Sequence, residues 1–352
     1  HLPPNYYLFS LHLNRLGVTV LGLADEPYDQ LRPELRGALA EYYRVGDMHH
    51  YDELLRGCGY FTHRYGKLNG LESHSEYWME TDARLRTDFN IHGPRLNDIA
   101  AYKRKSLMKA AFERAGVPAA RGRLIYAADD ARALIAETGY PIVAKPDIGV
   151  GASNTFCIED DAGLERFFAT RPPVDYIMEE FVRGQIVTFD GLADQDGRPV
   201  FFGSLVYNQG LMEVVNEDRD IFAYAERDVP ADLEEAGRRL LKEFDVRARF
   251  FHFEFFRLAD GSLVALEVNI RPPGGIALDI HNYSADVDLY WGWANVVVNN
   301  QFVDYVRPHY CCFASRKRHK AYRYSHADVL TTWGGLIATH EPLPEAFSQA
   351  MG

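Results

Sequence analysis

The chain has 352 residues, which suits two or three modules packed around a shared site. Hydrophobic residues make up 47% and charged residues 25%, so the composition excludes a disordered chain or a fibrous repeat. The net charge of −12 would repel a nucleic-acid backbone unless a local basic groove offset it, so we predict no nucleic-acid partner. The one dense basic run, residues 316–320 (RKRHK), is interpreted as a solvated loop, with a phosphate-facing patch as the alternative.

Cysteines and apolar segments indicate the compartment. The four cysteines show neither a CxxC pair nor metal-ligand spacing, and we expect reduced thiols at Cys58, Cys157, Cys311 and Cys312. No apolar stretch reaches the roughly 18 residues of a membrane span, and residues 1–25 lack the pattern of a secretory signal. We therefore predict a cytoplasmic protein without a membrane partner. Because a helix-like stretch follows almost directly after His1, we also expect the native N-terminus to be missing.

Hydrophobic periodicity up to about residue 98 is typical of a short α/β unit. The expected elements are a helix, a strand and two further helices, at residues 6–16, 18–23, 34–43 and 75–88. A first strand is expected to precede His1. Residues 3–5 would then form either a turn at the carboxyl end of that strand, where α/β sheets bind ligands, or a simple connecting loop.

The pattern changes after residue 98. A helix over 103–115 ends at Gly116, and Val117-Pro118 follows it, which matches a glycine cap with a proline beyond. The next elements predict a small α+β module with a strand, a helix and a second strand, at residues 123–126, 130–138 and 141–145. Further strands are expected at 175–179, 185–192 and 200–207, before a helix that opens at Pro230. The fold class is thus α/β combined with α+β.

The strongest chemical signal is a hairpin over residues 250–269, FFHFEFFRLADGSLVALEVN. Asp260-Gly261 is a turn signature, and a two-residue loop there places Glu254 directly opposite Glu267. Because side chains alternate along a strand, His252 shares the face of Glu254 and Asn269 shares the face of Glu267. Two carboxylates and an amide are therefore expected to meet on one side of the hairpin.

Like charges directly opposite each other destabilise a ladder, so this hairpin needs a compensating cation. Hard oxygen ligands with room for phosphates suit Mg²⁺. A lysine or arginine partner, or a solvated edge hairpin with its acids facing water, are the alternatives. Two lysines are candidates for a nucleotide site.

Lys145 ends an apolar strand and precedes the loop PDIGVGASNT, whose backbone amides could wrap phosphate oxygens. The loop matches neither the dinucleotide fingerprint nor the phosphate-loop signature, so on its own it is a weak signal. Lys105 lies near the start of the helix that ends at Gly116, where a surface lysine is the simplest interpretation.

Taken in order, these motifs resemble the ATP-grasp superfamily over roughly residues 99–300. Lys105, Met108 and the Gly-Val-Pro at 116–118 match a K-x-x-M helix, and Lys145-Pro146 matches a V-x-KP strand. The resemblance implies that both lysines bind ATP phosphates. It also implies a pre-ATP-grasp α/β domain followed by a two-lobed ATP-grasp fold, with boundaries at 1–98, 99–178 (small lobe with lid loop) and 179–352 (large lobe with C-terminal extension).

The resemblance assigns further residues to the nucleotide. It implies a lid over the phosphates at Gly149, Gly151, Ala152 and Ser153. It implies a hinge that reads the adenine through its backbone at Glu179, Glu180, Phe181 and Val182, and one further nucleotide contact at Leu266. The family usually has a glutamate two residues after the hinge glycine to hold the ribose, but here Ile186 stands at that position. Asp190 is a candidate substitute.

Glu254, Glu267 and Asn269 match the magnesium triad of the family, and Mn²⁺ is expected to be able to substitute. Many amide-forming members carry arginine two residues before the first acid, whereas this chain has His252. Arg271 could supply the missing positive charge, stabilising the acyl phosphate and the oxyanion formed on amine attack. A simple salt bridge is the alternative for Arg271.

The resemblance implies a carboxylate–amine ligase that forms an amide or peptide bond through an acyl phosphate, similar to L-amino acid ligases, D-alanine–D-alanine ligase and biotin carboxylases. Small-molecule carboxylates and amines, with amino acids among them, are the expected substrates, and a homodimer is an expected assembly. Two rivals are a biotin-carboxylase-like or purine-pathway enzyme and a non-catalytic ATP-binding regulatory protein. His74 and Glu76 could line the acceptor pocket or lie on a helix surface, and residues 208–227 could form a substrate loop or an ordinary surface excursion.

Overall fold

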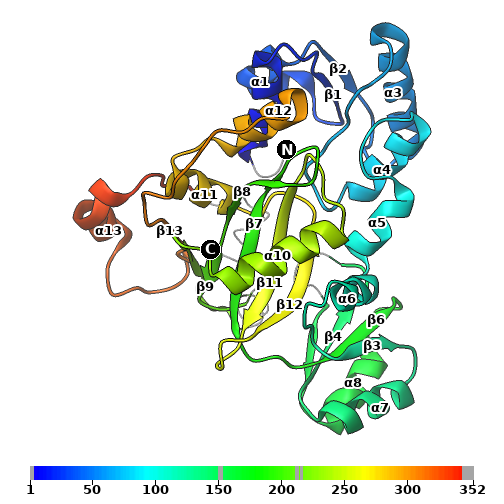
Figure 1. Ribbon diagram of the computed structural model, residues 1–352, viewed down its shortest axis with the longest axis vertical. Coiled ribbons are helices and arrows are strands. Elements are labelled where there is room, and N and C mark those ends of the chain that lie inside the picture. The colour runs from blue at the N-terminus through cyan, green and yellow to red at the C-terminus, as the bar shows by residue number, and fades with distance from the viewer. Residues whose placement is uncertain (1–3, 150–153, 211–213, 215–216, 343–352) are drawn as a thin grey trace.

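The computed structural model describes residues 4–149, 154–210, 214 and 217–342 (Figure 1). Within these residues the strands form three sheets, a two-stranded, a four-stranded and a seven-stranded one. The four-stranded sheet and the unit that holds the two-stranded sheet lie at opposite ends of the long axis, with the largest sheet between them (Figure 1). The mixture of parallel and antiparallel sheets with helices confirms the expected α/β and α+β class.

The N-terminal unit contains the two-stranded sheet, in which β1 (Leu21–Ala24) runs parallel to β2 (Glu41–Arg44). Its other elements are η1 (Pro4–Tyr6), α1 (Tyr7–Arg15), η2 (Tyr28–Gln30), α2 (Pro33–Ala38), α3 (Tyr51–Tyr65) and α4 (Met79–Asp88). The helix expected over 34–43 was wrong in its second half. Tyr42 and Tyr43 favour extended backbone, and pairing with β1 makes that segment a strand. Helix α3 was not anticipated.

Two helices connect this unit to the rest of the chain. Residues 103–115, expected as one helix, are divided between α5 (Leu96–Lys103) and α6 (Lys105–Arg114). Arg104 between them has extended backbone, with φ −91° and ψ 115°, and it places Lys105 at the start of a new helix. Gly116 has φ +66°, which confirms the expected glycine cap. The domain boundaries at residues 98 and 178 stay predictions. Residue 98 lies inside α5, and residue 178 lies inside a strand.

The small lobe is an antiparallel sheet with strand order β3-β6-β4-β5, covered by two helices. Its elements are β3 (Gly122–Ile125), α7 (Ala128–Thr138), β4 (Ile142–Pro146), β5 (Phe156–Ile158), α8 (Asp161–Thr170) and β6 (Tyr176–Glu180). The expected strands and helix are confirmed to within a few residues. Asp160 caps the N-terminus of α8, and its side chain accepts a hydrogen bond from the Gly163 N–H at 2.7 Å.

The large sheet has the strand order β12-β11-β7-β9-β10-β13, with β8 also paired to β7. Its strands are β7 (Gln185–Ala193), β8 (Pro199–Gly203), β9 (Leu205–Tyr207), β10 (Phe222–Ala225), β11 (Phe250–Arg257), β12 (Leu263–Asn269) and β13 (Cys312–Ala314). The strand expected over 200–207 is therefore two strands. Both β8 and β9 pair with β7.

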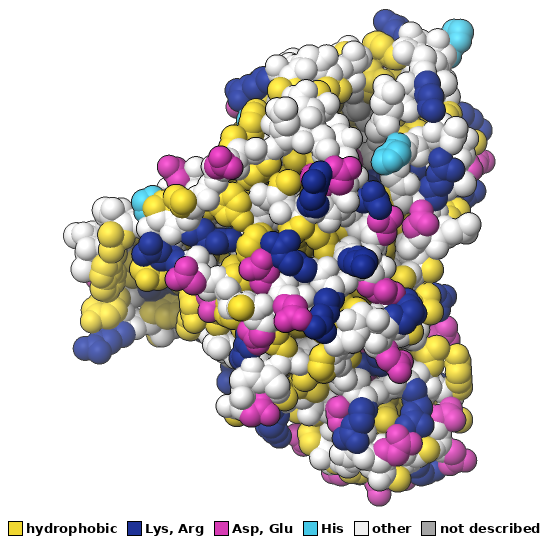
Figure 2. Space-filling model, viewed as in Figure 1, with side chains coloured by type: hydrophobic (Ala, Val, Ile, Leu, Met, Phe, Trp, Pro, Cys, Tyr) yellow, Lys and Arg dark blue, Asp and Glu magenta, His cyan; other side chains and the backbone are white. Residues whose placement is uncertain are grey.

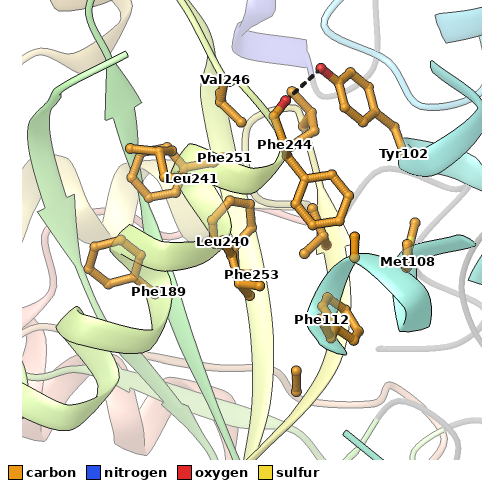
Figure 3. Close-up of a cluster of buried hydrophobic side chains, with 14 of the residues drawn as sticks. Tyr102, Met108, Phe112, Phe189, Leu240, Leu241, Phe244, Val246, Phe251 and Phe253 are labelled. Atoms are coloured by element: carbon orange, nitrogen blue, oxygen red, sulfur yellow. Dashed lines mark hydrogen bonds between the residues drawn. The ribbon is translucent and has the colours of Figure 1, made fainter. Parts of the chain in front are cut away.

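Helices cover both faces of the large sheet. On one face lies α10 (Ala231–Glu243), which follows Pro230 as expected and packs Leu240 and Leu241 with Phe189, Phe251 and Phe253 (Figure 3). On the other face lie α11 (Ala277–Ala285) and α12 (Leu289–Asn299), packed with Leu192, Phe201 and Phe250. Because side chains alternate along β11, its odd-numbered phenylalanines fill the α10 core, and His252 and Glu254 face the opposite side.

The C-terminal segment carries β13, α13 (His326–Trp333) and η3 (Gly334–Leu336). Helix α13 stands away from the body, and none of its described residues is buried (Figure 1). The face drawn in Figure 2 shows basic and acidic side chains interspersed, with apolar side chains along this arm.

The basic run at 316–320 lies in the same segment but is not a free solvated loop. Lys317 is buried and its Nζ lies 2.6 Å from Oδ1 of Asp218, and His319 and Lys320 also contact Asp218. Asp218 therefore holds the ammonium groups of Lys317 and Lys320, which also argues against a phosphate-facing patch.

Replacing Gly237 by alanine should lower the free energy of unfolding by about 1–3 kcal/mol, because an added Cβ would lie 2.2 Å from Cδ1 of Phe189. The same substitution at Gly59 in α3, where nothing lies within 4 Å of an added Cβ, should raise it by about 0.5–1 kcal/mol. Urea unfolding followed by circular dichroism measures both values. Similar effects at the two positions would contradict the close packing of α10 on the sheet.

Candidate active site

The β11–β12 hairpin brings the expected acids together. Glu254 is paired with Glu267 and His252 with Asn269, as expected from the sequence. The turn, however, differs from the expected two-residue loop. The N–H of Leu258 donates to the carbonyl of Ser262 at 2.9 Å, so three residues, 259–261, form the loop, and Gly261 takes φ +88°.

A β-bulge compensates for this longer turn. Phe255 pairs with Ala265 while Glu254 pairs with Glu267, so Leu266 is left without a partner in the ladder. The turn shifts the register by one residue, and the bulge at Leu266 shifts it back. The pairing of the two acids was therefore predicted correctly from an incorrect turn. Leu266, proposed as an ATP contact, owes its position to this bulge.

The polar residues of this face form two rows across the sheet. One row runs through Thr188, Glu254 and Glu267, and the next runs through Asp190, His252 and Asn269. The two rows lie side by side because successive same-face residues of a strand are two positions apart. These polar residues lie on β7, β11 and β12, three neighbouring strands at one edge of the large sheet, and Phe189, Phe251 and Phe253 lie on the opposite face.

Side chains of the protein neutralise both acids. The Nζ of Lys105 lies 2.8 Å from Oε1 of Glu267 and 3.3 Å from the carbonyl oxygen of Gly149, so it connects the acid to the start of the lid loop. The Nε2 of His252 lies 3.0 Å from Oε1 of Glu254. The expectation that the paired acids require a cation is met within the chain by these two residues.

His252 is held in its charged form. Burial acts to lower its pKa, but the charges and hydrogen bonds of Asp190 and Glu254 outweigh burial and raise the pKa of His252 to about 10. At neutral pH the ring is therefore protonated and donates from both nitrogens. Glu254 responds in the opposite direction: burial acts to raise its pKa, but the hydrogen bond from His252 helps to lower it overall.

Arg271 connects the large sheet to the N-terminal unit. Its Nη2 lies 2.9 Å from Oε2 of Glu76 and 3.2 Å from the Asn269 side-chain oxygen. Glu76 also lines a pocket of about 180 Å³ together with Tyr77, Lys103, Ile148 and Gly149. Glu76 thus lines a pocket, and its role in an acceptor pocket stays a prediction. The salt-bridge alternative for Arg271 is observed.

His74, expected beside Glu76, does not line this pocket. Its ring stacks on Phe9 with centroids 3.9 Å apart and meets the edge of Trp293 at 4.4 Å. Burial is the largest influence on this imidazole and lowers its pKa to about 4, so it is neutral at pH 7. His74 is therefore part of the packing between the N-terminal unit and the large sheet.

The hinge strand β6 carries a second group of charges. The two carboxylate oxygens of Glu179 contact Lys109 at 2.7 Å and Lys145 at 2.5 Å. Burial acts to raise the pKa of Glu179, but the two lysines outweigh it and lower the pKa to about 2. Lys109 was missed in the sequence, although its position four residues after Lys105 on one helix face was a usable signal.

Glu180 also has its contacts inside the protein. Its side chain pairs with Arg121, with Nη2 at 2.6 Å from Oε2, and its N–H donates to the Arg121 carbonyl at 2.9 Å. Only the carbonyl oxygen of Glu180 could then serve an adenine, together with the backbone of Val182. Phe181 uses its N–H for the carbonyl of Pro141 at 3.2 Å.

Asp190 does not have the environment expected for a ribose contact. It is fully buried, Oδ1 accepts from Nδ1 of His252 at 2.6 Å, and Oδ2 accepts from Thr188 at 2.6 Å and from His281 at 2.9 Å. The ribose role is therefore wrong for this residue, because no carboxylate oxygen reaches the surface. The sequence could not reveal this, since the two histidines approach from β11 and α11.

Some expected residues cannot be placed. Gly151, Ala152 and Ser153 of the lid loop lie outside the described residues. Among the residues that are described, no group of three or more His, Cys, Asp or Glu side chains is arranged to hold a metal ion. The candidate magnesium ligands are instead two carboxylates and the amide oxygen of Asn269.

None of the described helices has the length and apolar character that a membrane span requires.

Known proteins show the same architecture. No family model matches the chain. In sequence it is 25% identical over 221 residues to the L-arginine-specific L-amino acid ligase of Bacillus subtilis, a match that covers 60% of this chain and 53% of that ligase. The chain thus spans about half the length of this curated relative.

Solved structures give the fold. The biotin carboxylase domain of Hydrogenobacter thermophilus 2-oxoglutarate carboxylase, solved with MgADP, has a TM-score of 0.66 and 18% identity, covering 85% of this chain and 69% of that chain. An L-amino acid ligase from Bacillus licheniformis has a TM-score of 0.63 and 14% identity, covering 84% of this chain and 72% of that chain. The chain has the ATP-grasp fold, which confirms the resemblance inferred from its motifs.

The Glu179–lysine pair predicts a pH-dependent contribution to stability. Because the pKa of Glu179 is lowered from 4.5 to about 2, its contribution is complete above pH 4.5 and declines as the pH falls toward 2; it is at most about 3 kcal/mol. Glu179→Gln should therefore be less stable than the wild type at pH 7, with a smaller difference at pH 3.

Urea unfolding at the two pH values measures this difference. Glu137→Gln in the same lobe is the control, because Glu137 forms an exposed pair with Arg123 and should change stability little at either pH. An equal deficit of Glu179→Gln at pH 7 and pH 3 would contradict the linkage.

Proposed function

We propose that the chain is an ATP-dependent carboxylate–amine ligase that forms an amide or peptide bond through an acyl phosphate and releases ADP and phosphate. The observation that carries the proposal is the pairing of Glu254 with Glu267 in the large sheet, with Lys105 extending from Glu267 to Gly149. This arrangement joins the acidic face of the sheet to the start of the glycine-containing loop. The ATP-grasp fold and the sequence similarity to an L-amino acid ligase support the same activity.

The donor set of this face fits magnesium. Glu254 and Glu267 supply carboxylate oxygens and Asn269 an amide oxygen, the hard ligands that Mg²⁺ prefers, with Mn²⁺ as a proposed substitute. When bound, the ion would neutralise charge on the β- and γ-phosphates of ATP. Lys105 now compensates the charge of Glu267, and we propose that it instead contacts phosphate oxygens in the nucleotide complex.

Lys145 and the hinge would hold the rest of the nucleotide. Lys145 lies on β4 beside the hinge strand, where Glu179 fixes its ammonium group. Because Lys109 contacts the other oxygen of Glu179, the acid remains paired when Lys145 turns to a phosphate. We propose that the carbonyl of Glu180 and the backbone of Val182 read the adenine.

Arg271 and Glu76 would position the carboxylate substrate. This pair has opposite charges beside a pocket of about 180 Å³, which matches a ligand with a carboxylate and an ammonium group. A free amino acid is such a ligand, and two of the similar proteins are L-amino acid ligases. We propose amino acids as the substrate class.

The reaction would proceed in two steps. The carboxylate oxygen forms a bond to the γ-phosphorus as the bond to ADP breaks. The amine nitrogen then bonds to the acyl carbon, phosphate leaves with its oxygen, and the amine gives up a proton. Arg271, as a fixed cation beside the acyl group, would stabilise the negative charge that develops in both steps.

Wild-type protein with Mg²⁺, ATP and pooled amino acids should release ADP and phosphate, and an amide of the summed mass should appear in mass spectrometry. Glu267→Gln should reduce this release by about a hundredfold or more, because it removes one negative ligand of the ion and keeps the shape. Other carboxylates, amines and bicarbonate serve as parallel pools. Release with bicarbonate alone would favour a carboxylase, and nucleotide binding without any turnover would favour a regulatory protein.

Arg271→Lys should reduce amide formation by about 10²–10³-fold while MgADP affinity changes little, since lysine keeps the charge but loses the planar fork that contacts Glu76 and Asn269. Steady-state rates and calorimetric titration with MgADP separate the two effects. Equal loss of nucleotide affinity and rate would show that Arg271 acts on the nucleotide rather than on the acyl group.

A further inference from the structure

A buried chain of hydrogen bonds lies directly behind Glu254. It begins at His281 on α11, whose Nε2 lies 2.9 Å from Oδ2 of Asp190. It continues from Oδ1 of Asp190 to Nδ1 of His252 at 2.6 Å, and from Nε2 of His252 to Oε1 of Glu254 at 3.0 Å. The chain therefore connects a helix on one face of the large sheet to the acid proposed to bind magnesium.

Each member of this chain has a fixed hydrogen-bonding direction. The Thr188 hydroxyl accepts from the N–H of Leu205 at 3.0 Å, so its own hydrogen is free to go to Asp190, whose Oδ2 lies 2.6 Å away. Asp190 is fully buried and accepts at both oxygens. The Nδ1 and Nε2 of His252 lie 2.6 Å from Asp190 and 3.0 Å from Glu254, so one orientation of the ring contacts both acids.

The backbone is adapted to admit His281. Gly203 on β8 pairs with Asp190 on β7, and a Cβ at Gly203 would lie 2.8 Å from the His281 ring. Glycine at this position therefore leaves space for the His281 ring of α11 to pack on the sheet beside Asp190. The edge of the Phe201 ring, with centroids 5.8 Å apart, closes the other side of the His281 ring.

A burial of this kind has a cost that packing alone does not explain. A carboxylate and two histidines lie next to a core of Leu192, Phe201 and Phe250, where apolar side chains of the same volume would give a more stable fold. We therefore expect these three polar residues to have a role other than stability. Asp190 and His252 lie in the same polar row of the sheet, and the Nε2 of His252 contacts Glu254 at 3.0 Å.

We propose that Asp190 and His281 are positioning residues, which hold the His252 ring so that its Nε2 contacts and orients the carboxylate of Glu254 for the metal. This inference rests on the proposed function, because it assigns Glu254 as a magnesium ligand. Neither residue is among the groups proposed to contact the substrate or the nucleotide. They act through His252, as hydrogen-bonded outer partners orient the ligands of many metal sites.

Asp190→Asn and His281→Leu should each raise the Mg²⁺ concentration needed for half-maximal ADP binding by about 10–100-fold. Affinity for ADP at saturating Mg²⁺ should change by less than about threefold, since the groups that would contact the nucleotide are intact. His281→Gln, which keeps a donor near Asp190, should shift the Mg²⁺ requirement much less than His281→Leu. Isothermal titration of ADP at a series of Mg²⁺ concentrations gives both quantities without relying on turnover.

Asp194→Asn is the matched control. Asp194 is also a buried carboxylate, but it closes the β7–β8 turn by accepting from the N–H groups of Asp196 and Arg198 at 2.9 and 2.8 Å. Its loss should lower stability and leave the Mg²⁺ requirement unchanged.

If His281→Leu folds and keeps the wild-type Mg²⁺ requirement, the proposal is overturned. This holds even if Asp190→Asn does not fold. An equal shift in Asp194→Asn would overturn it too, because the effect would then follow stability alone. Wild-type protein that binds no ADP at any Mg²⁺ concentration would instead contradict the proposed function, and that result is visible before any variant is compared.

Discussion

Repulsion between two facing carboxylates is the constraint around which this molecule is organised. Glu254 and Glu267 lie opposite each other in a sheet whose reverse face is a phenylalanine core, so their charges cannot be left unbalanced. Lys105 from the connecting helix balances one, and His252 on the neighbouring row balances the other. The charges that would destabilise the hairpin are therefore balanced by ionic contacts with other side chains of the protein.

Ionic contacts connect this acidic face to other parts of the chain. The N-terminal unit supplies Glu76, which pairs with Arg271, two residues after the end of β12. The break at Arg104 starts a new helix at Lys105, which contacts Glu267. The small lobe holds a separate ion pair between Lys145 and Glu179. Because these contacts are ionic, they can be exchanged for contacts with phosphates, a cation and a charged substrate. Such exchangeable pairs are what a site for ATP and an acyl acceptor requires.

The hairpin illustrates how far local rules reach. Alternation and the Asp260-Gly261 turn signature predicted the facing acids, yet the real turn is one residue longer and the bulge at Leu266 restores the pairing. A bulge is selected by packing on both faces of the sheet, so no turn rule could have found it. The prediction missed both the longer turn and the bulge, and their effects on the register cancel. A strand with one strongly buried face favours this cancellation, because a register slip of one residue would bury the acids.

The sequence by itself determined the helix ends at Gly116 and Pro230, the strands on either side of the hinge, and the residue types that can hold a nucleotide and magnesium. These features follow from periodicity and from neighbours a few positions apart. The tertiary structure alone decided which charges meet. Glu76 and Arg271 are 195 positions apart, and Asp190 and His281 are 91 apart. Their contacts depend on how the helices pack against the sheet, and the pattern of one strand or one helix carries no information about its distant partners.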